Sequence, residues 1–133
     1  MNDKNWNLLM DKAKKNLNSH SVSDYMECGS YSCAIMTDKG NVYSGINIES
    51  SLQGISAEKA AISNMLSNGE TKITKLLVMN ELEECILPID DTYLYLMELG
   101  IDLDSISVLL KNEEVKMIEL VPDWVGTFRI VRQ

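Results

Sequence analysis

Residues 29–62 read GSYSCAIMTDKGNVYSGINIESSLQGISAEKAAI, and the first half of this stretch decides the fold. Residues 29–36 combine small, apolar and aromatic side chains, a composition that predicts a β-strand. The polar segment 37–41 contains a glycine, which supplies the permissive backbone that a tight turn needs. Residues 42–46 then predict a returning strand, so the two segments form a β-hairpin.

An α-helix is expected after the hairpin. Ser56 is a suitable N-cap residue, because its hydroxyl can accept a hydrogen bond from a backbone N–H of the first turn. Residues 57–68 are helix formers with an apolar face, and Gly69 lies where such a helix would end. We interpret residues 47–55 as a loop, and residues 73–79, which are rich in β-branched and apolar side chains, as a third strand.

The remaining segments complete one domain. Apolar positions at helical spacing predict a first helix over residues 3–17, followed by a polar break over 18–24. A third helix is expected from Pro88 to about Leu99, and the last two strands over 105–110 and 114–119. A strand–helix–strand step after the hairpin indicates a mixed sheet with helices packed on it, and therefore a single α/β domain.

The net charge of −8 argues against nucleic acid as a partner, because phosphate binding needs a cationic surface. Basic residues gather at Lys12, Lys14 and Lys15, where the spacing predicts the solvent face of the first helix. Such a chain accommodates a small uncharged or cationic ligand more easily. No apolar run reaches the length of a membrane span, so we expect no membrane partner.

The cysteines Cys28, Cys33 and Cys85 follow no zinc-binding spacing. Cys28 and Cys33 fall in a strand that we expect to be buried, where a free thiol acts as a small hydrophobic group. The first residues are polar and do not resemble a signal peptide. We therefore expect a soluble protein of the reducing cytoplasm.

Six segments occur in an order and spacing that are more specific than any one of them. They are DKGNVYSG (38–45), NIE (47–49), GISAEKAAI (54–62), SNGETK (67–72), LPIDDT (87–92) and ELVPDW (119–124). In this order they resemble the cytidine deaminase and blasticidin S deaminase family. The second segment is similar to the family's Asn-x-Glu element and the third to its Cys-Ala-Glu helix start. The fifth falls where the family has Pro-Cys-x-x-Cys.

The resemblance implies a three-layer cytidine-deaminase-like fold over residues 1–133, with a mixed five-stranded sheet and helices on both faces. It implies that Asn47 and Glu49 bind the ribose hydroxyls of a nucleoside, and that Glu58 occupies the position of the proton-shuttling glutamate. Family members form dimers and tetramers whose subunits complete each other's pockets. A homo-oligomer, either a dimer or a tetramer, is therefore implied here too.

Two of these roles have alternatives that the residues support. Glutamate is common in the first turn of a helix, where it stabilises the helix dipole, so Glu58 fits a structural role as well as a catalytic one. Asn47 fits a residue whose side chain bonds its own backbone to shape a turn.

The zinc ligands of the family are missing. Its members hold zinc with three Cys, or with one His and two Cys, and the zinc-bound water supplies the hydroxide that attacks the base. The corresponding positions here are Ser56, Ile89 and Thr92. Isoleucine has no donor atom, and neutral hydroxyls are poor zinc ligands. We therefore predict neither a bound metal nor another cofactor.

Substitute ligands are poorly placed in the sequence. His20 is the only histidine and is expected in an exposed turn, and Cys85 lies four residues before the second ligand position. Asp90 and Asp91 would form a hard-cation site with Glu58. We favour the interpretation that these two aspartates stabilise the start of the third helix.

Three hypotheses of function follow. The first is a zinc-free pseudoenzyme that binds a nucleoside-like small molecule through Asn47, Glu49 and Glu58. The second is a protein-interaction or regulatory module whose pocket is vestigial. The third, which we rank last, is an active nucleoside deaminase with an atypical site.

Overall fold

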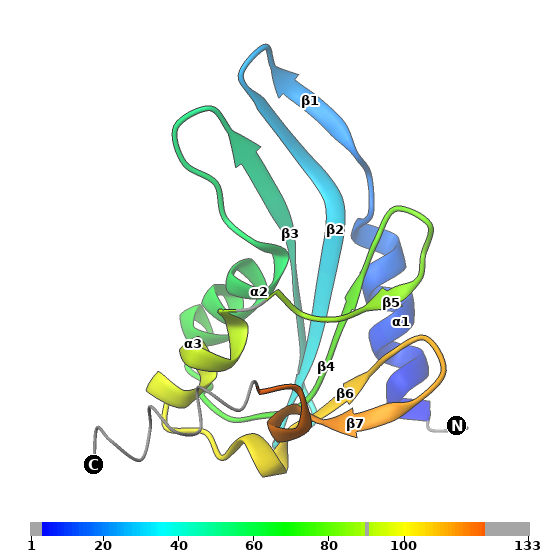
Figure 1. The fold of residues 1–133 in the computed structure, drawn as a ribbon, viewed down its shortest axis with the longest axis vertical. Helices are drawn as coiled ribbons and strands as arrows, with labels where there is room; N and C mark the ends of the chain where they lie inside the picture. The colour runs from blue at the N-terminus through cyan, green and yellow to red at the C-terminus, as the bar shows by residue number, and fades with distance from the viewer. Residues whose placement is uncertain (1–3, 90, 122–133) are drawn as a thin grey trace.

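The structure is a computed structural model that describes residues 4–89 and 91–121. Within these residues, three α-helices pack against a seven-stranded mixed sheet (Figure 1). The helices are α1 (Lys4–Asn16), α2 (Ala57–Ser67) and α3 (Thr92–Glu98), and the strands are β1 (His20–Ser23), β2 (Met26–Thr37), β3 (Val42–Ser50), β4 (Ile73–Met79), β5 (Cys85–Ile86), β6 (Ser107–Leu109) and β7 (Glu114–Lys116). Two short 3₁₀ turns span Leu103–Ser105 and Met117–Leu120.

The long strand β2 organises the sheet. It pairs antiparallel with β3 along one edge. Along its other edge it pairs with β4 through residues 32–37 and with β1 through residues 26–28. The parallel strand β6 and the short antiparallel strand β5 both pair with the edge of β4 that faces away from β2, and β7 pairs with β6. Strands β1, β2 and β3 project together beyond the helices (Figure 1).

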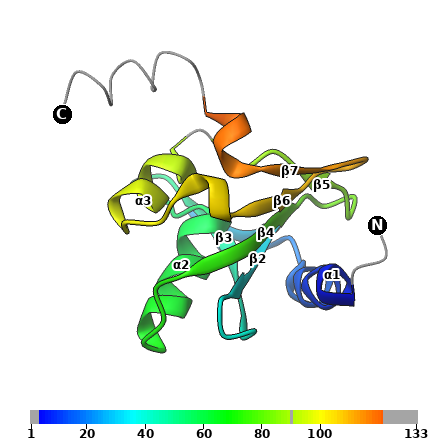
Figure 2. The ribbon, with the colours of Figure 1, turned by 90° about the horizontal axis from the view of Figure 1, so that it is seen from below.

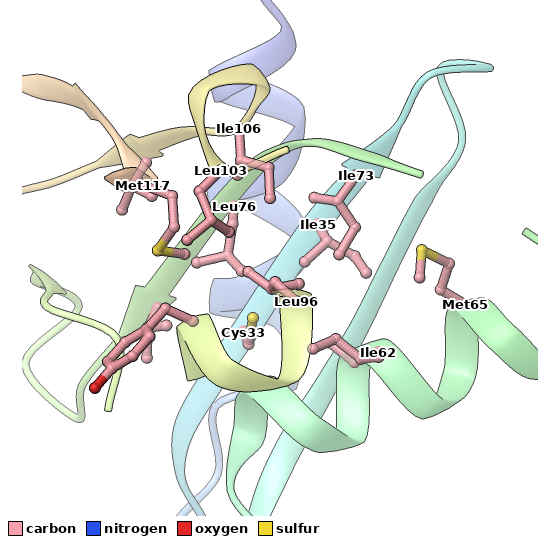
Figure 3. Packing of buried hydrophobic residues seen from close by; sticks show 14 of the residues in the cluster. Cys33, Ile35, Ile62, Met65, Ile73, Leu76, Leu96, Leu103, Ile106 and Met117 are labelled. Carbon is pink, nitrogen blue, oxygen red and sulfur yellow. The ribbon is translucent and has the colours of Figure 1, made fainter. Parts of the chain in front are cut away.

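Helices cover both faces of the sheet (Figure 2). On one face, Trp6, Leu9 and Ala13 of α1 pack against β4 and β2. On the other, α2 and α3 place Ile62, Met65 and Leu96 over buried sheet residues such as Ile35 and Leu76 (Figure 3). The amphipathic first helix, the α/β class and the three-layer arrangement are therefore as predicted.

The elements at the centre of the fold match their prediction best. Strand β4 spans residues 73–79 as expected, α2 ends one residue early, and Gly69 follows it with a φ of 83°. The predicted hairpin is present, although both strands are longer. Residues 47–50, predicted as part of a loop, continue β3, and 48–50 pair with the start of β2.

Several peripheral predictions were wrong. The sheet has seven strands rather than five, because His20–Ser23 in the predicted polar break forms β1 and Cys85–Ile86 forms β5. All four residues of β1 are exposed, so no apolar alternation marks it. Helix α3 begins at Thr92 rather than Pro88, after a turn in which the Thr92 N–H bonds the Ile89 carbonyl.

The last two strands, β6 and β7, are also shorter than predicted. Strand β7 ends at Lys116, and a 3₁₀ turn follows it. The carboxylate of Glu119 in this turn accepts a hydrogen bond from the Lys116 N–H at 2.8 Å. The residues Pro122, Asp123 and Trp124 of the last resembling segment lie outside the described residues. No helix in residues 4–89 and 91–121 has the length and apolar character that crossing a bilayer requires.

Gly45 sets how closely α2 lies on β3. A Cβ at this position would lie 2.4 Å from the backbone nitrogen of Ala61 and 2.6 Å from the Cβ of Ala60. Only a residue without a side chain fits between strand and helix at this distance. The contact fixes the first half of α2 beside the middle of β3.

A buried carboxylate fastens the other end of α2. Glu70, just after the helix, accepts hydrogen bonds from Asn41 Nδ2 at 2.8 Å and from Tyr43 Oη at 2.5 Å. Hydrogen bonding by Thr37, Tyr43 and Asn41 lowers the pKa of Glu70 below its ordinary value of 4.5. The hydrogen bond to Glu70 in turn raises the pKa of Tyr43 above its ordinary value.

Replacing Glu70 should therefore destabilise the protein in a pH-dependent way. A carboxyl whose pKa is lowered by folding stabilises the fold above its unfolded pKa, and that contribution is lost as the pH falls through the lowered value. Glu70→Gln should reduce the free energy of unfolding at pH 7, and the difference from the wild type should shrink as the pH falls below about 4.5. Urea unfolding at a series of pH values measures this, and a difference that stays constant contradicts the assignment.

Candidate functional site

A pocket of about 590 Å³ opens where the end of β3, the start of α2 and residues 86–89 meet. Five of the six predicted site residues line it: Asn47, Glu49, Ser56, Glu58 and Ile89. Ligand pockets of this size are common, and most of their lining is apolar with a few convergent polar groups. The sequence prediction therefore identified residues that the fold does bring together.

The loop before α2 is held in place by its own backbone. Ile48 and Ile55 form an isolated antiparallel bridge in which each N–H donates to the other's carbonyl at 2.9 Å. A Cβ on Gly54 would lie 2.5 Å from the Ile48 oxygen, so this close approach requires glycine. The bridge positions Ser56, the residue after Ile55, in the wall of the pocket.

Ser56 begins α2 as predicted. Its backbone is extended, and its hydroxyl oxygen accepts the Lys59 N–H at 3.1 Å. This bond satisfies one of the N–H groups that the first turn of a helix leaves unpaired. The Ser56 hydroxyl therefore has a structural partner.

Glu58 lies in the first turn of α2 and is only 2% exposed. Its Oε2 accepts the backbone N–H of Ile89 at 2.7 Å. Burial, and then the negative charge of Glu58, raise the pKa of the neighbouring Cys33 thiol. Glu58 is thus a carboxylate enclosed by core on one side and lining the pocket on the other.

The amide of Asn47 is occupied by neighbours in the sheet. Its Oδ1 accepts the Tyr31 N–H and its Nδ2 donates to Ser30 Oγ, both at 2.9 Å. Nδ2 also lies 3.4 Å from Glu49 Oε2. Between Cys28 and Ser32, where the pairing of β2 with β3 is irregular, these side-chain bonds connect the two strands. The alternative in which Asn47 bonds its own backbone was wrong, because its partners lie on the adjacent strand.

The pocket presents two carboxylates in different settings. Glu49 is exposed at the rim, near the Asn47 amide, and Glu58 is buried at the floor. Both can accept hydrogen bonds from hydroxyl or amino groups of a ligand. Tyr31, Ile86 and Leu87 add apolar lining.

Comparison with known proteins gives matches in structure but not in sequence. No protein-family model and no curated protein matches the chain. The solved cytidine deaminase of Mycobacterium leprae superposes with a TM-score of 0.75 at 18% identity, over 91% of this chain and 100% of that chain. The enzyme of Mycobacterium tuberculosis gives 0.75 at 21%, over 91% and 97%. That of Burkholderia pseudomallei gives 0.68 at 23%, over 88% and 96%.

This chain has the cytidine deaminase fold. The matches cover nearly the full length of both chains, so the likeness concerns the whole domain rather than one motif. It confirms the fold that the order of the six sequence segments implied. At these identities the likeness establishes the shared architecture.

On this cytidine deaminase fold, the three predicted ligand positions do not fit zinc. The Ser56 hydroxyl caps α2, and the Ile89 side chain has no donor atom and is 47% exposed. Thr92 is buried and lines a different cavity, of about 340 Å³, together with Tyr93 and Met117. Zinc sites need thiolate, imidazole or carboxylate ligands that converge on one point, and these side chains supply none.

The substitute ligands do not complete a site either. His20 is exposed as predicted, but it lies in strand β1 and not in a turn. Cys85 is buried in β5. Among the described residues, no group of three or more His, Cys, Asp or Glu side chains is placed to share a metal ion. Asp90 lies outside the described residues, so the acidic cluster proposed around it stays a prediction.

Asp91 has a role that the sequence did not indicate. It is the N-cap residue of α3, at the start of the helix as predicted, but its side chain makes no capping hydrogen bond. Its Oδ2 instead pairs with Lys59 Nζ at 2.9 Å, and this ammonium also lies 4.9 Å from the centre of the Tyr95 ring. The ion pair, which is partly exposed, joins α3 to α2 beside the pocket.

Replacing Ser56 tests its capping role. Ser56→Ala should lower the free energy of unfolding by about 1 kcal/mol, because the Lys59 N–H loses its partner. Ser56→Asp should retain most of the stability, since aspartate is an equally good cap. Chemical unfolding of both variants measures the effect. Equal stability of Ser56→Ala and the wild type contradicts this role.

Proposed function

We propose that this chain binds a nucleoside-like small molecule in the pocket lined by Glu49 and Glu58, and that it does so as a zinc-free pseudoenzyme. The observation that carries the proposal is the Glu58 carboxylate, which lies on the floor of an open pocket although burial of a charge is costly. A purely structural glutamate in a helix's first turn is normally exposed to solvent.

The chemistry of the pocket favours a ligand rich in hydrogen-bond donors. Two carboxylates face it, and the sequence carries a net charge of −8. Glu49 at the rim suits the paired hydroxyls of a sugar, and Glu58 at the floor suits an amino group on a ring. Apolar lining from Ile55, Val78 and Ile86 suits the faces of a flat base. The solved structures compared above are cytidine deaminases, which supports a pyrimidine nucleoside in particular.

The side chains at the three predicted ligand positions support a function that does not use zinc. A deaminase of this fold needs a metal-activated water as nucleophile, and Glu58 alone supplies only a proton acceptor. The side chains at positions 56, 89 and 92 offer a capping hydroxyl, an alkyl group and a buried hydroxyl in another cavity. Binding without turnover is the function that this combination supports.

The proposal extends to a homo-oligomer in the cytoplasm. Large apolar side chains are exposed where the strands project past the helices, with Val22, Tyr25 and Leu52 exposed by 60%, 75% and 96%. Large apolar side chains exposed to this degree support association with another chain. Light scattering should give the mass of a dimer or tetramer, and Leu52→Asp should reduce it. A wild-type monomer contradicts this extension.

Ligand titration tests the proposed function. We expect calorimetry to detect cytidine binding in the micromolar range, and cytidine 5′-monophosphate to bind more weakly because its phosphate meets an acidic pocket. Glu58→Gln keeps an oxygen for the Ile89 N–H but removes the charge, and should weaken cytidine binding on the order of tenfold. Glu81→Gln, which changes an exposed carboxylate outside the pocket, is the matched control.

Two outcomes contradict the proposal in different ways. Absence of binding by cytidine, deoxycytidine, uridine and blasticidin S, in a protein that remains folded, supports an interaction module with a vestigial pocket. Release of ammonia from cytidine above background, lost in Glu58→Gln, supports an active deaminase.

A further inference from the structure

A cysteine and a histidine face each other on the projecting hairpin, outside the pocket. Cys28 of β2 and His20 of β1 are directly paired across the two strands. Cys28 Sγ lies 3.4 Å from His20 Nε2, within hydrogen-bonding distance for sulfur. Neither residue lines the pocket proposed to bind a nucleoside.

The other ring nitrogen of His20 is held by the backbone. Nδ1 lies 2.5 Å from the carbonyl oxygen of Asn18. A carbonyl only accepts hydrogen bonds, so Nδ1 carries the hydrogen in this contact. In the neutral imidazole, Nε2 is then the acceptor, and the thiol of Cys28 is the donor. The ring is therefore in the tautomer that can remove the thiol proton.

The backbone of Asn18 holds both His20 and the strand that carries Cys28. Gly29, next to Cys28, has a φ of 86°, and its carbonyl accepts the Asn18 N–H at 3.0 Å. A Cβ on Gly29 would lie 2.2 Å from the Asn18 oxygen, so only glycine permits the approach. Asn18 thus anchors the strand that carries Cys28 and orients the ring of His20. A nucleophile, a base and a group that orients the base form the pattern of an activated nucleophile.

Exposure separates Cys28 from the other thiols. His20 is exposed and Cys28 is half-buried, whereas Cys33 and Cys85 are buried. Burial and the charge of Glu58 raise the pKa of Cys33, and burial raises that of Cys85, so both are held as thiols. A reagent in solution therefore meets one accessible thiol with a base beside it.

We propose that Cys28 and His20 form a thiol-exchange site that takes low-molecular-mass disulfides, with a preference for cationic ones. The thiolate is the reactive form of cysteine, and a base at hydrogen-bonding distance generates it. The preference follows from the acidic surroundings, because Asp24 and Glu27 are exposed on the same hairpin and the net charge of the chain is −8.

The exchange balances without a further oxidant. The proton of Cys28 moves to His20 Nε2, and the thiolate attacks one sulfur of the disulfide. The new bond joins Cys28 to that half of the reagent, while the reagent's own S–S bond breaks. The departing thiolate takes the proton from the imidazolium and leaves as a thiol. The product is a mixed disulfide on β2, next to Ile48 of β3 at the pocket.

The test follows the rate of modification of each cysteine with cystamine, a cationic disulfide, by mass spectrometry of peptides from the folded protein. Cys28 should react before Cys33 and Cys85. His20→Gln keeps a polar side chain of similar length but has no base, and should slow the reaction of Cys28 on the order of tenfold. Ser21→Ala, which changes the next residue of the same strand, should leave the rate unchanged. Oxidised glutathione, which is anionic, should react more slowly than cystamine.

The dependence on His20 decides the proposal, since exposure alone would also make Cys28 the first thiol to react. An unchanged rate in His20→Gln, with circular dichroism showing an intact fold, overturns it. Equal rates with cystamine and oxidised glutathione overturn the preference for cationic disulfides. Neither result depends on whether the pocket binds a nucleoside.

Discussion

The hydrogen bond from the Ile89 N–H to the Glu58 carboxylate is the contact on which the pocket depends. It joins the first turn of α2 to the segment between β5 and α3, two parts of the chain separated by strands β4 and β5. A buried carboxylate without such a donor would be strongly destabilising. The bond therefore closes the floor of the pocket and at the same time holds a charged acceptor inside it.

The rim of the pocket depends on an irregularity in β2. Between Cys28 and Ser32 the strand carries extra residues relative to β3, and the Asn47 amide bonds two of them. Extra residues of this kind bend a strand and redirect side chains near functional sites. Beside this irregularity lie Glu49, which lines the pocket, and the paired residues Cys28 and His20. Contacts between Gly29 and Asn18 hold that end of the strand.

The sequence predicted those features that depend on neighbouring residues. The hairpin, the Ser56 cap and strand β4 have local signals in turn chemistry, capping and apolar composition. The order of the resembling segments also located five of the six residues at the pocket. Strand β1, with four exposed residues, has no such signal. The pairs Glu58–Ile89, Lys59–Asp91 and His20–Cys28 join residues whose proximity only the folded sheet and helices create.

We propose that this chain, which has the cytidine deaminase fold, binds a nucleoside-like molecule in its pocket without zinc. Native mass spectrometry of the purified protein with added cytidine tests both parts in one spectrum. The account predicts a complex whose mass equals the protein plus cytidine, with one ligand per chain and no metal. A mass that includes one zinc ion per chain, or a spectrum in which cytidine never binds, would contradict it.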